Sequence, residues 1–288
     1  MNSVIETMLR KHNPKNNEER ENAAKEILQE IALAGLSRGG FFEKVAFCGG
    51  TCFRIFYGLN RFSEDLDFAL LEKGGDFQLS WYFPALEKEF ASYGIEIHAE
   101  EKKKTHEPAV QSAFLKGNTL ALMMSFFPRS EDARKIISNQ KMKIKFEVDT
   151  DNPEGGRFET KFKLLPAPYE VKAFDESTLF AGKIHALICR KYKNSVKGRD
   201  YYDYLFNIGK ETSFNLNYLE NKLKCTGTIP QNEPLTLSRV KEMLQARFET
   251  VDYGLAKEDV SNFIFDKAEL NLWQKELFLA TLNDLRAD

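Results

Sequence analysis

Two aspartates, Asp65 and Asp67, are separated by a single residue. The apolar run 68–71 that follows them predicts a β-strand, on which side chains repeat with period two. We therefore expect both carboxylates on one face, with Leu66 and Phe68 anchoring the other face in the core. Carboxylates this close repel each other unless a cation lies between them. Hard divalent cations suit such oxygen ligands, so the pattern predicts a magnesium site, with manganese as an alternative.

A glycine turn precedes this acidic strand. Gly49, Gly50 and Thr51 follow a short apolar segment, 42–47, that predicts a strand, and they open a helical segment that ends near Tyr57. Glycines at a strand-to-helix turn let a ligand approach the backbone, whose N–H groups bind phosphate. The Thr51 hydroxyl is expected to cap the helix or to bind phosphate. A plain tight turn with a threonine cap explains the same residues, and the acidic strand nearby favours the phosphate site.

Further candidates lie beside these two motifs. Arg54, Arg61 and Ser63 stand between the turn and the aspartates and are expected to face the same cleft. A third carboxylate is expected on the alternating segment 141–149, whose polar face ends in Glu147 and Asp149. We prefer Glu147, because it lies one pleat deeper, while a solvated strand face would explain either residue alone.

A second constellation lies in the C-terminal half. Lys183 falls on a predicted helix, 177–193, and Arg199, Asp200 and Asp203 fall on the next one, 199–208. Asp200 and Asp203 are three residues apart and share one helical face. Lys183 is a candidate for contact with a triphosphate, with Arg199 near it. The alternative is that the arginine and the two aspartates form salt bridges between helices.

The composition is that of a globular protein. The 288 residues are 42% hydrophobic and 29% charged, and the formal net charge is −2, which argues against bulk coating of nucleic acid but leaves room for a local basic groove. The four cysteines form no Cys-x-x-Cys pair, so reduced thiols in a cytoplasmic protein are expected. The N-terminus does not resemble a secretory signal, and no apolar run is long enough to span a membrane.

Periodicity and turn signals predict an α+β fold, with mixed strands and helices first and helices alone from about Asp175. We place a catalytic domain with N-terminal helices at 1–174 and a helical domain that contributes to the nucleotide site at 175–288. In the first, Gly35 is expected to end a helix that Asn17 caps, and Pro84 either kinks or begins a helix. Expected helices are 4–10, 17–34, 49–57, 76–92, 177–193, 199–208, 215–224, 236–248, 257–263 and 270–285. Expected strands are 42–47, the acidic strand, 95–103, a hairpin of 109–115 with 119–126, 141–149, 157–164 and 169–173, and segment 130–137 has turn-like and helical features.

In this order, the motifs resemble those of the AbiEii/AbiGii-type nucleotidyltransferase toxins. The resemblance rests on Gly49-Gly50-Thr51, Asp65-Leu66-Asp67, an acidic strand with Glu147, then Lys183 and Arg199-Asp200, and runs from about Val45 to Phe206. It implies a polymerase-beta-like catalytic core with a mixed sheet flanked by helices. It also implies that Asp65 and Asp67 bind metal, that Lys183 binds the nucleotide, and that Asp200 belongs to the catalytic centre. Such families include toxins paired with antitoxins, and some relatives modify tRNA ends.

The residues and the resemblance together predict a magnesium-dependent transfer of a nucleoside monophosphate from a nucleoside triphosphate. Such catalysis is mostly positioning and charge neutralisation, and two metals about 4 Å apart can stabilise the attacking and leaving oxygens. Glu147 is expected to act with Asp65 and Asp67. The expected acceptor is an RNA, such as a tRNA 3′ end, with a protein hydroxyl less favoured. Two alternatives remain at this stage: a small-molecule nucleotidyltransferase of the antibiotic-modifying type, and an inactive nucleotide-binding module. Tyr201 and Tyr202 are candidates to stack on a base, although packing in the core or between helices is the favoured explanation for them.

Overall fold

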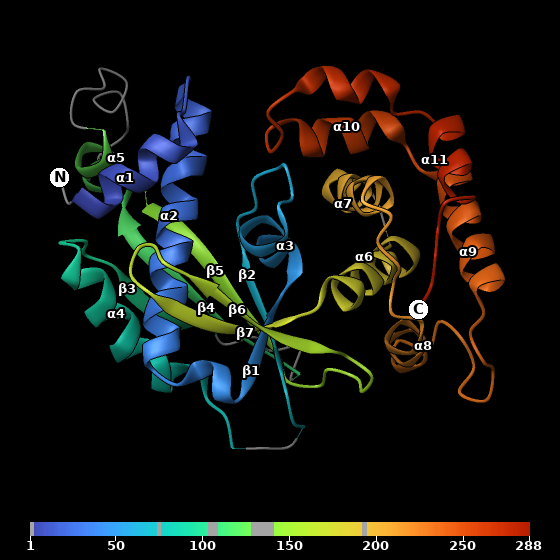
Figure 1. Cartoon of the computed structure of the whole chain (residues 1–288), viewed down its shortest axis with the longest axis horizontal. Coiled ribbons are helices and arrows are strands. Elements are labelled where there is room, and N and C mark those ends of the chain that lie inside the picture. Colours follow the sequence, from blue (N-terminus) through green and yellow to red (C-terminus); the bar gives the residue numbers. More distant parts are fainter. Residues whose placement is uncertain (1–2, 74–75, 103–108, 128–140, 192–194) are drawn as a thin grey trace. The chain divides into compact units, whose positions relative to one another are not determined.

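The computed structural model describes residues 3–73, 76–102, 109–127, 141–191 and 195–288 (Figure 1). The chain divides into two compact units, which are described separately. Unit 1 comprises Met1–Cys52, Phe62–Asn152 and Glu159–Ala173, and unit 2 comprises Phe53–Arg61, Pro153–Phe158 and Phe174–Asp288. Two short segments of the N-terminal half thus belong to the mainly C-terminal unit. No helix in the described residues is both long and apolar enough to cross a membrane.

Unit 1 is built on a mixed β-sheet. Within the described ranges the sheet has seven strands in the order β3-β4-β5-β2-β1-β7-β6. Strands β1/β7 and β2/β5 pair in parallel, whereas β1/β2, β3/β4 and β4/β5 pair antiparallel. The strands are β1 (Val45–Cys48), β2 (Leu66–Leu70), β3 (His98–Lys102), β4 (Val110–Asn118), β5 (Lys141–Asp149), β6 (Phe158–Lys163) and β7 (Tyr169–Phe174).

Helices of unit 1 cover one face of this sheet. They are α1 (Ser3–His12), α2 (Asn17–Arg38), η1 (Phe41–Glu43), η2 (Leu79–Tyr82), α4 (Phe83–Ser92) and α5 (Thr119–Phe126). Phe68 of β2 lies at the centre of the core, with its ring centroid 4.9 Å from Phe41, 5.2 Å from Phe47 and 5.9 Å from Phe146. Aromatic pairs at these distances add to the burial of apolar area. We call this the core face.

The opposite face carries the polar side chains. Directly opposed residues on paired strands point to the same side, and successive residues alternate. Phe47, Phe68 and Phe146 share the core face, so Cys48, Asp67 and Glu147, their neighbours in sequence, share the other. We call it the polar face. The prediction that Leu66 and Phe68 lie on the face opposite to the carboxylates is therefore confirmed for Asp67.

Unit 2 is helical. Its helices are α6 (Glu176–Cys189), α7 (Gly198–Gly209), α8 (Leu216–Cys225), α9 (Leu237–Thr250), α10 (Tyr253–Ser261), η4 (Lys267–Leu272) and α11 (Lys275–Thr281), and it also contains the end of α3 (Gly49–Tyr57). The Asp175 side chain caps α6 by accepting the Thr178 N–H. Tyr201 and Phe278, with ring centroids 5.6 Å apart, contribute to its core. The expected mixed α/β architecture with a helical C-terminal part is confirmed.

Two local predictions, the helix end at Gly35 and the hairpin around Gly117, were wrong. Helix α2 is capped by Asn16 and continues past Gly35 to Arg38, because Gly35 serves packing: a Cβ there would lie 2.9 Å from the Cβ of Glu89 on α4. Of the two alternatives for Pro84, the later helix start is confirmed, because α4 begins at Phe83 with Pro84 in its first turn. The hairpin around Gly117 does not form, since β4 runs through Asn118, whose side chain caps α5 by accepting the Ala121 N–H. Segment 130–137 lies outside the described residues.

Candidate active site

Asp67 and Glu147 are direct neighbours across two parallel strands. The register of β2 and β5 pairs Asp67 with Glu147. On the outer sides of this pair, Cys48 of β1 lies opposite Asp67, and Ser112 of β4 lies opposite Glu147. These four residues form one row across the polar face. Neighbouring strands lie about 4.8 Å apart, so the two carboxylates lie side by side on the sheet.

Glu147 has polar partners within unit 1. The Ser112 hydroxyl donates to Glu147 Oε1 at 3.1 Å, and the Lys145 ammonium pairs with Oε2. The Glu147 side chain is 22% exposed, so it is partly open to solvent. Nothing in the local sequence around Ser112 marks it as a site residue. Only the β4–β5 register places it beside the carboxylate.

Asp149, the other candidate for the third carboxylate, lies further along β5. Its partner across the strands is Ala69, and its Oδ1 accepts the N–H of Asp151 in the following turn at 3.0 Å. The register therefore places Glu147, and not Asp149, opposite Asp67.

Gly49 lies directly against Asp67. Its φ is +76°, in the left-handed region that glycine tolerates best. A Cβ added to Gly49 would lie 2.9 Å from the Cβ and 3.0 Å from the Cγ of Asp67. Both the backbone conformation and the close approach to the carboxylate thus require glycine at this position. The helix predicted to begin at this turn is confirmed as α3, with Gly50 buried in its first turn.

We expect Gly49→Ala to disturb the site more than it disturbs the fold. The left-handed backbone should cost about 1–2 kcal/mol of unfolding free energy. Gly58 is the matched control, because its φ is +79° and no atom of the described residues lies within 4 Å of a Cβ added there. Gly58→Ala should show a similar loss in urea unfolding. Only Gly49→Ala should also lower pyrophosphate release by more than about tenfold, since it displaces the Asp67 carboxylate. Equal activities of the two variants would contradict this account.

The segment before β2 is fixed by two buried polar side chains. Thr51 is fully buried, and its hydroxyl donates to the carbonyl of Asp65. Gln29 of α2 is 1% exposed, and its Nε2 donates to the carbonyls of Ser63 at 3.0 Å and Glu64 at 2.9 Å. Strand β2 begins at Leu66, so Asp65 lies just before the strand rather than on it. The local sequence does not mark Gln29 as a site residue, because it is a polar residue off the apolar stripe of its helix.

The donor types on the polar face suit a hard divalent cation. Asp67 and Glu147 supply carboxylate oxygens from adjacent strands, and Asp65 is one residue from β2. Over the described residues, no group of three or more His, Cys, Asp or Glu side chains is already arranged to hold a metal ion. The carboxylates of Asp67 and Glu147 are of the donor type that magnesium accepts, and metal binding by this pair, with Asp65 as a third candidate, stays a prediction.

Unit 2 contains a buried charge cluster centred on Asp203. The Arg61 guanidinium donates two parallel hydrogen bonds to its carboxylate, both at 2.7 Å, and Lys183 Nζ lies 2.8 Å from Oδ2. Asp203 is fully buried and Arg61 is 2% exposed. Burial alone would raise the pKa of Asp203, but the charges and hydrogen bonds of Arg61 and Lys183 outweigh it and lower the pKa. The salt-bridge interpretation of Asp203 is therefore confirmed.

The remaining candidates of unit 2 also have local partners. Lys183 is 14% exposed and lies 3.6 Å from Asp200, which pairs with Arg190 as well. Arg199 lies over the ring of Phe263, 4.2 Å from its centroid. Lys183 and Asp200 are thus brought together.

Arg54 belongs to unit 2 as well. It donates to the carbonyl of Leu59 at 3.0 Å. Tyr201 is fully buried, and the Tyr202 hydroxyl donates to the carbonyl of Asn60 at 2.9 Å, so the packing interpretation of both tyrosines is confirmed. Of the residues predicted to bind the nucleotide, Gly49, Gly50, Thr51 and Ser63 lie in unit 1, the unit that contains Asp67 and Glu147. The others lie in unit 2.

A mixed sheet with paired carboxylates beside a glycine turn is the arrangement expected of a nucleotidyltransferase. A family model described as nucleotidyl transferase AbiEii toxin, type IV toxin–antitoxin system, matches residues 31–278. The chain belongs to this family and is a nucleotidyltransferase.

Comparison with individual proteins gives more distant similarities. A proposed nucleotidyltransferase from H. pylori shares 18% identity, with a TM-score of 0.46 over 91% of this chain and 96% of that one. The protein JHP933 from Helicobacter pylori shares 16% identity, with a TM-score of 0.43 over 91% and 93%. No curated protein matches significantly.

Proposed function

We propose that this toxin-family nucleotidyltransferase transfers a nucleoside monophosphate from a nucleoside triphosphate to an RNA, with a tRNA 3′ end as the preferred acceptor, and that it requires magnesium. The observation that carries the proposal is the Asp67–Glu147 pair, with Gly49 closed against Asp67. The family description supports a toxin with a cognate antitoxin and a nucleotide substrate. The RNA acceptor is proposed because the resemblance to this family, some of whose relatives modify tRNA ends, implies it.

The proposed chemistry is an in-line displacement. The acceptor hydroxyl attacks the α-phosphorus, the new P–O bond forms, the α–β bridging P–O bond breaks, and pyrophosphate leaves. Glu147 is the proposed acceptor of the hydroxyl proton. Magnesium, held by Asp65, Asp67 and Glu147, would supply neutralisation of charge on the phosphoryl oxygens.

The other residues bind and position. N–H groups in the first turn of α3, from Gly49 to Thr51, are proposed to hold phosphate oxygens, because the first N–H groups of a helix lack intrahelical acceptors. Thr51 also fixes Asp65 through its hydroxyl. Lys183 is the proposed triphosphate-binding lysine of unit 2, and the carboxylates of Asp203 and Asp200 position its ammonium group.

The direct test is transfer of label. Purified protein is incubated with each of the four α-labelled nucleoside triphosphates, total RNA and magnesium, and the RNA is separated on a denaturing gel. We expect labelled RNA in the tRNA size range, lost when the metal is chelated. The Asp65→Ala protein should label none. A wild-type protein that labels no RNA with magnesium or manganese and any triphosphate would contradict the proposal.

A further inference from the structure

A ring flanked by lysines lies on the polar face beside the carboxylates. The register pairs Phe114 of β4 with Lys145 of β5, one pleat away from the Ser112–Glu147 pair. Two residues along a strand span about 7 Å, so Phe114 lies within reach of the carboxylates. Two ammonium groups approach its ring, Lys102 at 5.6 Å and Lys116 at 5.9 Å from the centroid.

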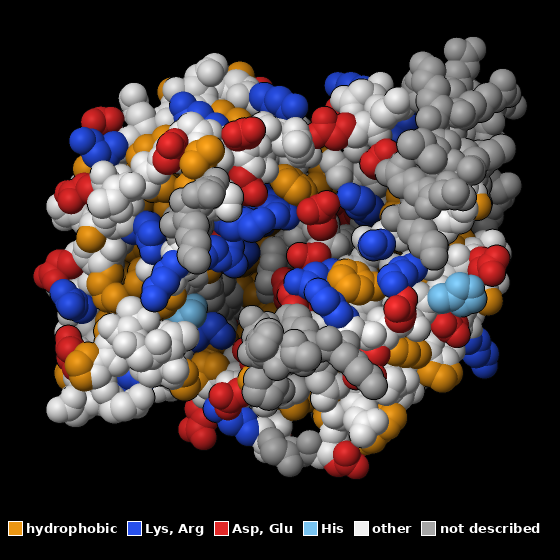
Figure 2. All heavy atoms as spheres, turned by 180° about the vertical axis from the view of Figure 1, so that it is seen from behind, with side chains coloured by type: hydrophobic (Ala, Val, Ile, Leu, Met, Phe, Trp, Pro, Cys, Tyr) orange, Lys and Arg blue, Asp and Glu red, His pale blue; other side chains and the backbone are white. Residues whose placement is uncertain are grey.

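All of these side chains belong to one surface of unit 1. Pairing places Lys102 opposite Ser112, and Lys116 opposite Lys143. The side chains of these three lysines therefore lie on the polar face, as do those of Phe114 and Lys145. We call Lys102, Phe114, Lys116, Lys143 and Lys145 the lysine–phenylalanine surface. Lys102 and Lys143 are exposed, and the other three are partly exposed. Figure 2 shows basic and acidic side chains interspersed over one face of the molecule. The register gathers four lysines around the ring of Phe114.

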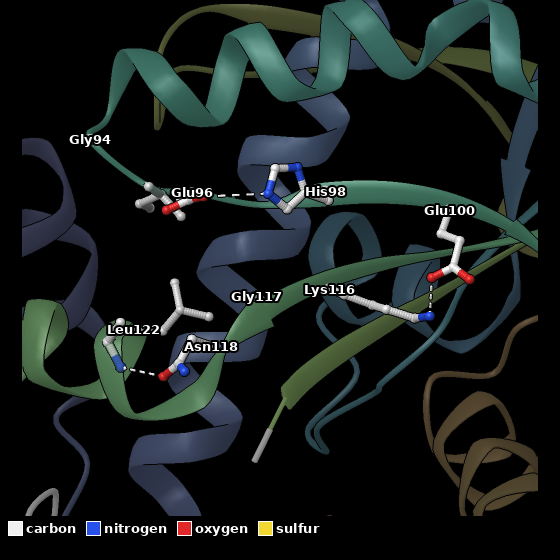
Figure 3. Close-up of a pocket in the computed structure, with 10 residues that line it drawn as sticks. Gly94, Glu96, His98, Glu100, Lys116, Gly117, Asn118 and Leu122 are labelled. Atoms are coloured by element: carbon white, nitrogen blue, oxygen red, sulfur yellow. Dashed lines mark hydrogen bonds and ion pairs between the residues drawn. The ribbon is translucent and has the colours of Figure 1, made fainter. Parts of the chain in front are cut away.

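Acidic side chains on the same strands pair with part of this charge. Glu100 pairs with Lys116 across β3 and β4 (Figure 3), and Glu147 pairs with Lys145. Lys116 also lines a cavity of about 480 Å³ whose wall includes Ile95 and Leu122. The surface therefore continues from the carboxylates, over Phe114, to this cavity.

We propose that the lysine–phenylalanine surface binds the single-stranded 3′ end of the acceptor RNA, with a base stacked on Phe114 and phosphates on the lysines. An aromatic ring on a sheet face offers a stacking platform for any base, and lysines around it bind the backbone. The ammonium groups lie farther from the ring centroid than a stacked base would, and their flexible stems let them turn to phosphates. This proposal rests on the proposed RNA acceptor and names the form in which it is recognised.

The experiment measures RNA binding separately from transfer. Fluorescence anisotropy is recorded with a short single-stranded RNA and with a blunt RNA duplex. The proteins are wild type, Phe114→Ala, Phe114→Trp, and a double variant that combines Lys102→Gln and Lys143→Gln. We expect preference for the single strand, about tenfold weaker binding for Phe114→Ala, and near-normal binding for Phe114→Trp. The double lysine variant should reduce the slope of log affinity against log salt by about 1.4. The KM for the triphosphate should not change in any of them.

Trp81→Ala is the matched control, because Trp81 is 47% exposed and has the Lys44 ammonium 5.4 Å from its ring centroid. It belongs to η2, whose Tyr82 packs on Phe41 in the core. This variant should bind RNA like wild type. Normal RNA affinity in Phe114→Ala and in the double lysine variant would overturn this proposal even if wild type labels RNA. Binding that depends on Phe114, without any transfer of label to RNA, would instead overturn the proposed acceptor and leave the surface assigned.

Discussion

Asp67→Asn should lower the rate of nucleotidyl transfer by about 10²–10³-fold while the protein remains folded. The substitution keeps the shape that fits under Gly49 but removes the negative charge opposite Glu147. Charge stabilisation by a bound metal is worth several kcal/mol, and each 1.4 kcal/mol changes a rate about tenfold. Initial rates of pyrophosphate release, measured with saturating triphosphate, give the effect on kcat.

Asp149→Asn provides the control for Asp67→Asn on the same sheet face. Asp149 lies two residues beyond Glu147 and opposite Ala69, so its loss should change the rate only a few-fold. Glu147→Gln should behave like Asp67→Asn. Binding of Mn²⁺ measured by electron paramagnetic resonance should weaken in Asp67→Asn and Glu147→Gln but not in Asp149→Asn. If Asp149→Asn caused the larger losses, the assignment of the third carboxylate would have to move to Asp149.

The largest expected effect on stability belongs to Asp203. Asp203→Asn leaves the Arg61 guanidinium, which is 2% exposed, and Lys183 without their common counter-charge. Removal of one partner from a buried ion pair costs about 3–5 kcal/mol. Urea unfolding followed by circular dichroism should show this loss. Asp259→Asn, which removes partly exposed pairs to Lys197 at 3.7 Å and Arg199 at 3.6 Å, should cost less than about 1 kcal/mol.

The pH dependence of this loss has a defined sign. The pKa of Asp203 is lower in the folded protein than its ordinary value, so its contribution is complete above the pKa of the unfolded state, about 3.9. It is lost as the pH falls further, through the folded pKa. The difference in unfolding free energy between wild type and Asp203→Asn should therefore be constant above about pH 5 and shrink below pH 4. A difference that grows in acid would contradict the lowered pKa.

The parts of the site that depend on local sequence could be predicted. The turn at Gly49, the acidic strand around Asp67 and the alternation of β5 each arise from neighbouring residues, and each is found near its predicted position, except that Asp65 precedes the strand. The pairing of Asp67 with Glu147 is different, because register depends on contacts between strands that lie far apart in sequence. For the same reason Ser112 and Gln29, which contact the site only through the fold, carry no signal of their own.

The errors in secondary structure have a common physical cause. A glycine such as Gly35 is typical of a helix end. Here it lies inside the helix, because its lack of a side chain allows close packing against Glu89. The residues Lys116-Gly117-Asn118 have the composition of a turn, yet a Cβ on Gly117 would lie 2.8 Å from Leu122 Cδ1, so this glycine also serves close packing. In both places local propensity is overridden by contacts that a single sequence does not reveal.

The membership of residues 53–61 in unit 2 has a consequence for how the chain folds. Arg61 and Asp203 are 142 residues apart, and so are Asn60 and Tyr202, which are joined by a hydrogen bond. Contacts of such long range slow folding, because the loop between them must close before they form. During synthesis the segment is made long before its partners in α7, and the helices of unit 2 cannot bury Asp203 with its full counter-charge until it docks. A fragment that contains only the C-terminal helices should therefore collapse without reaching the native packing around this aspartate.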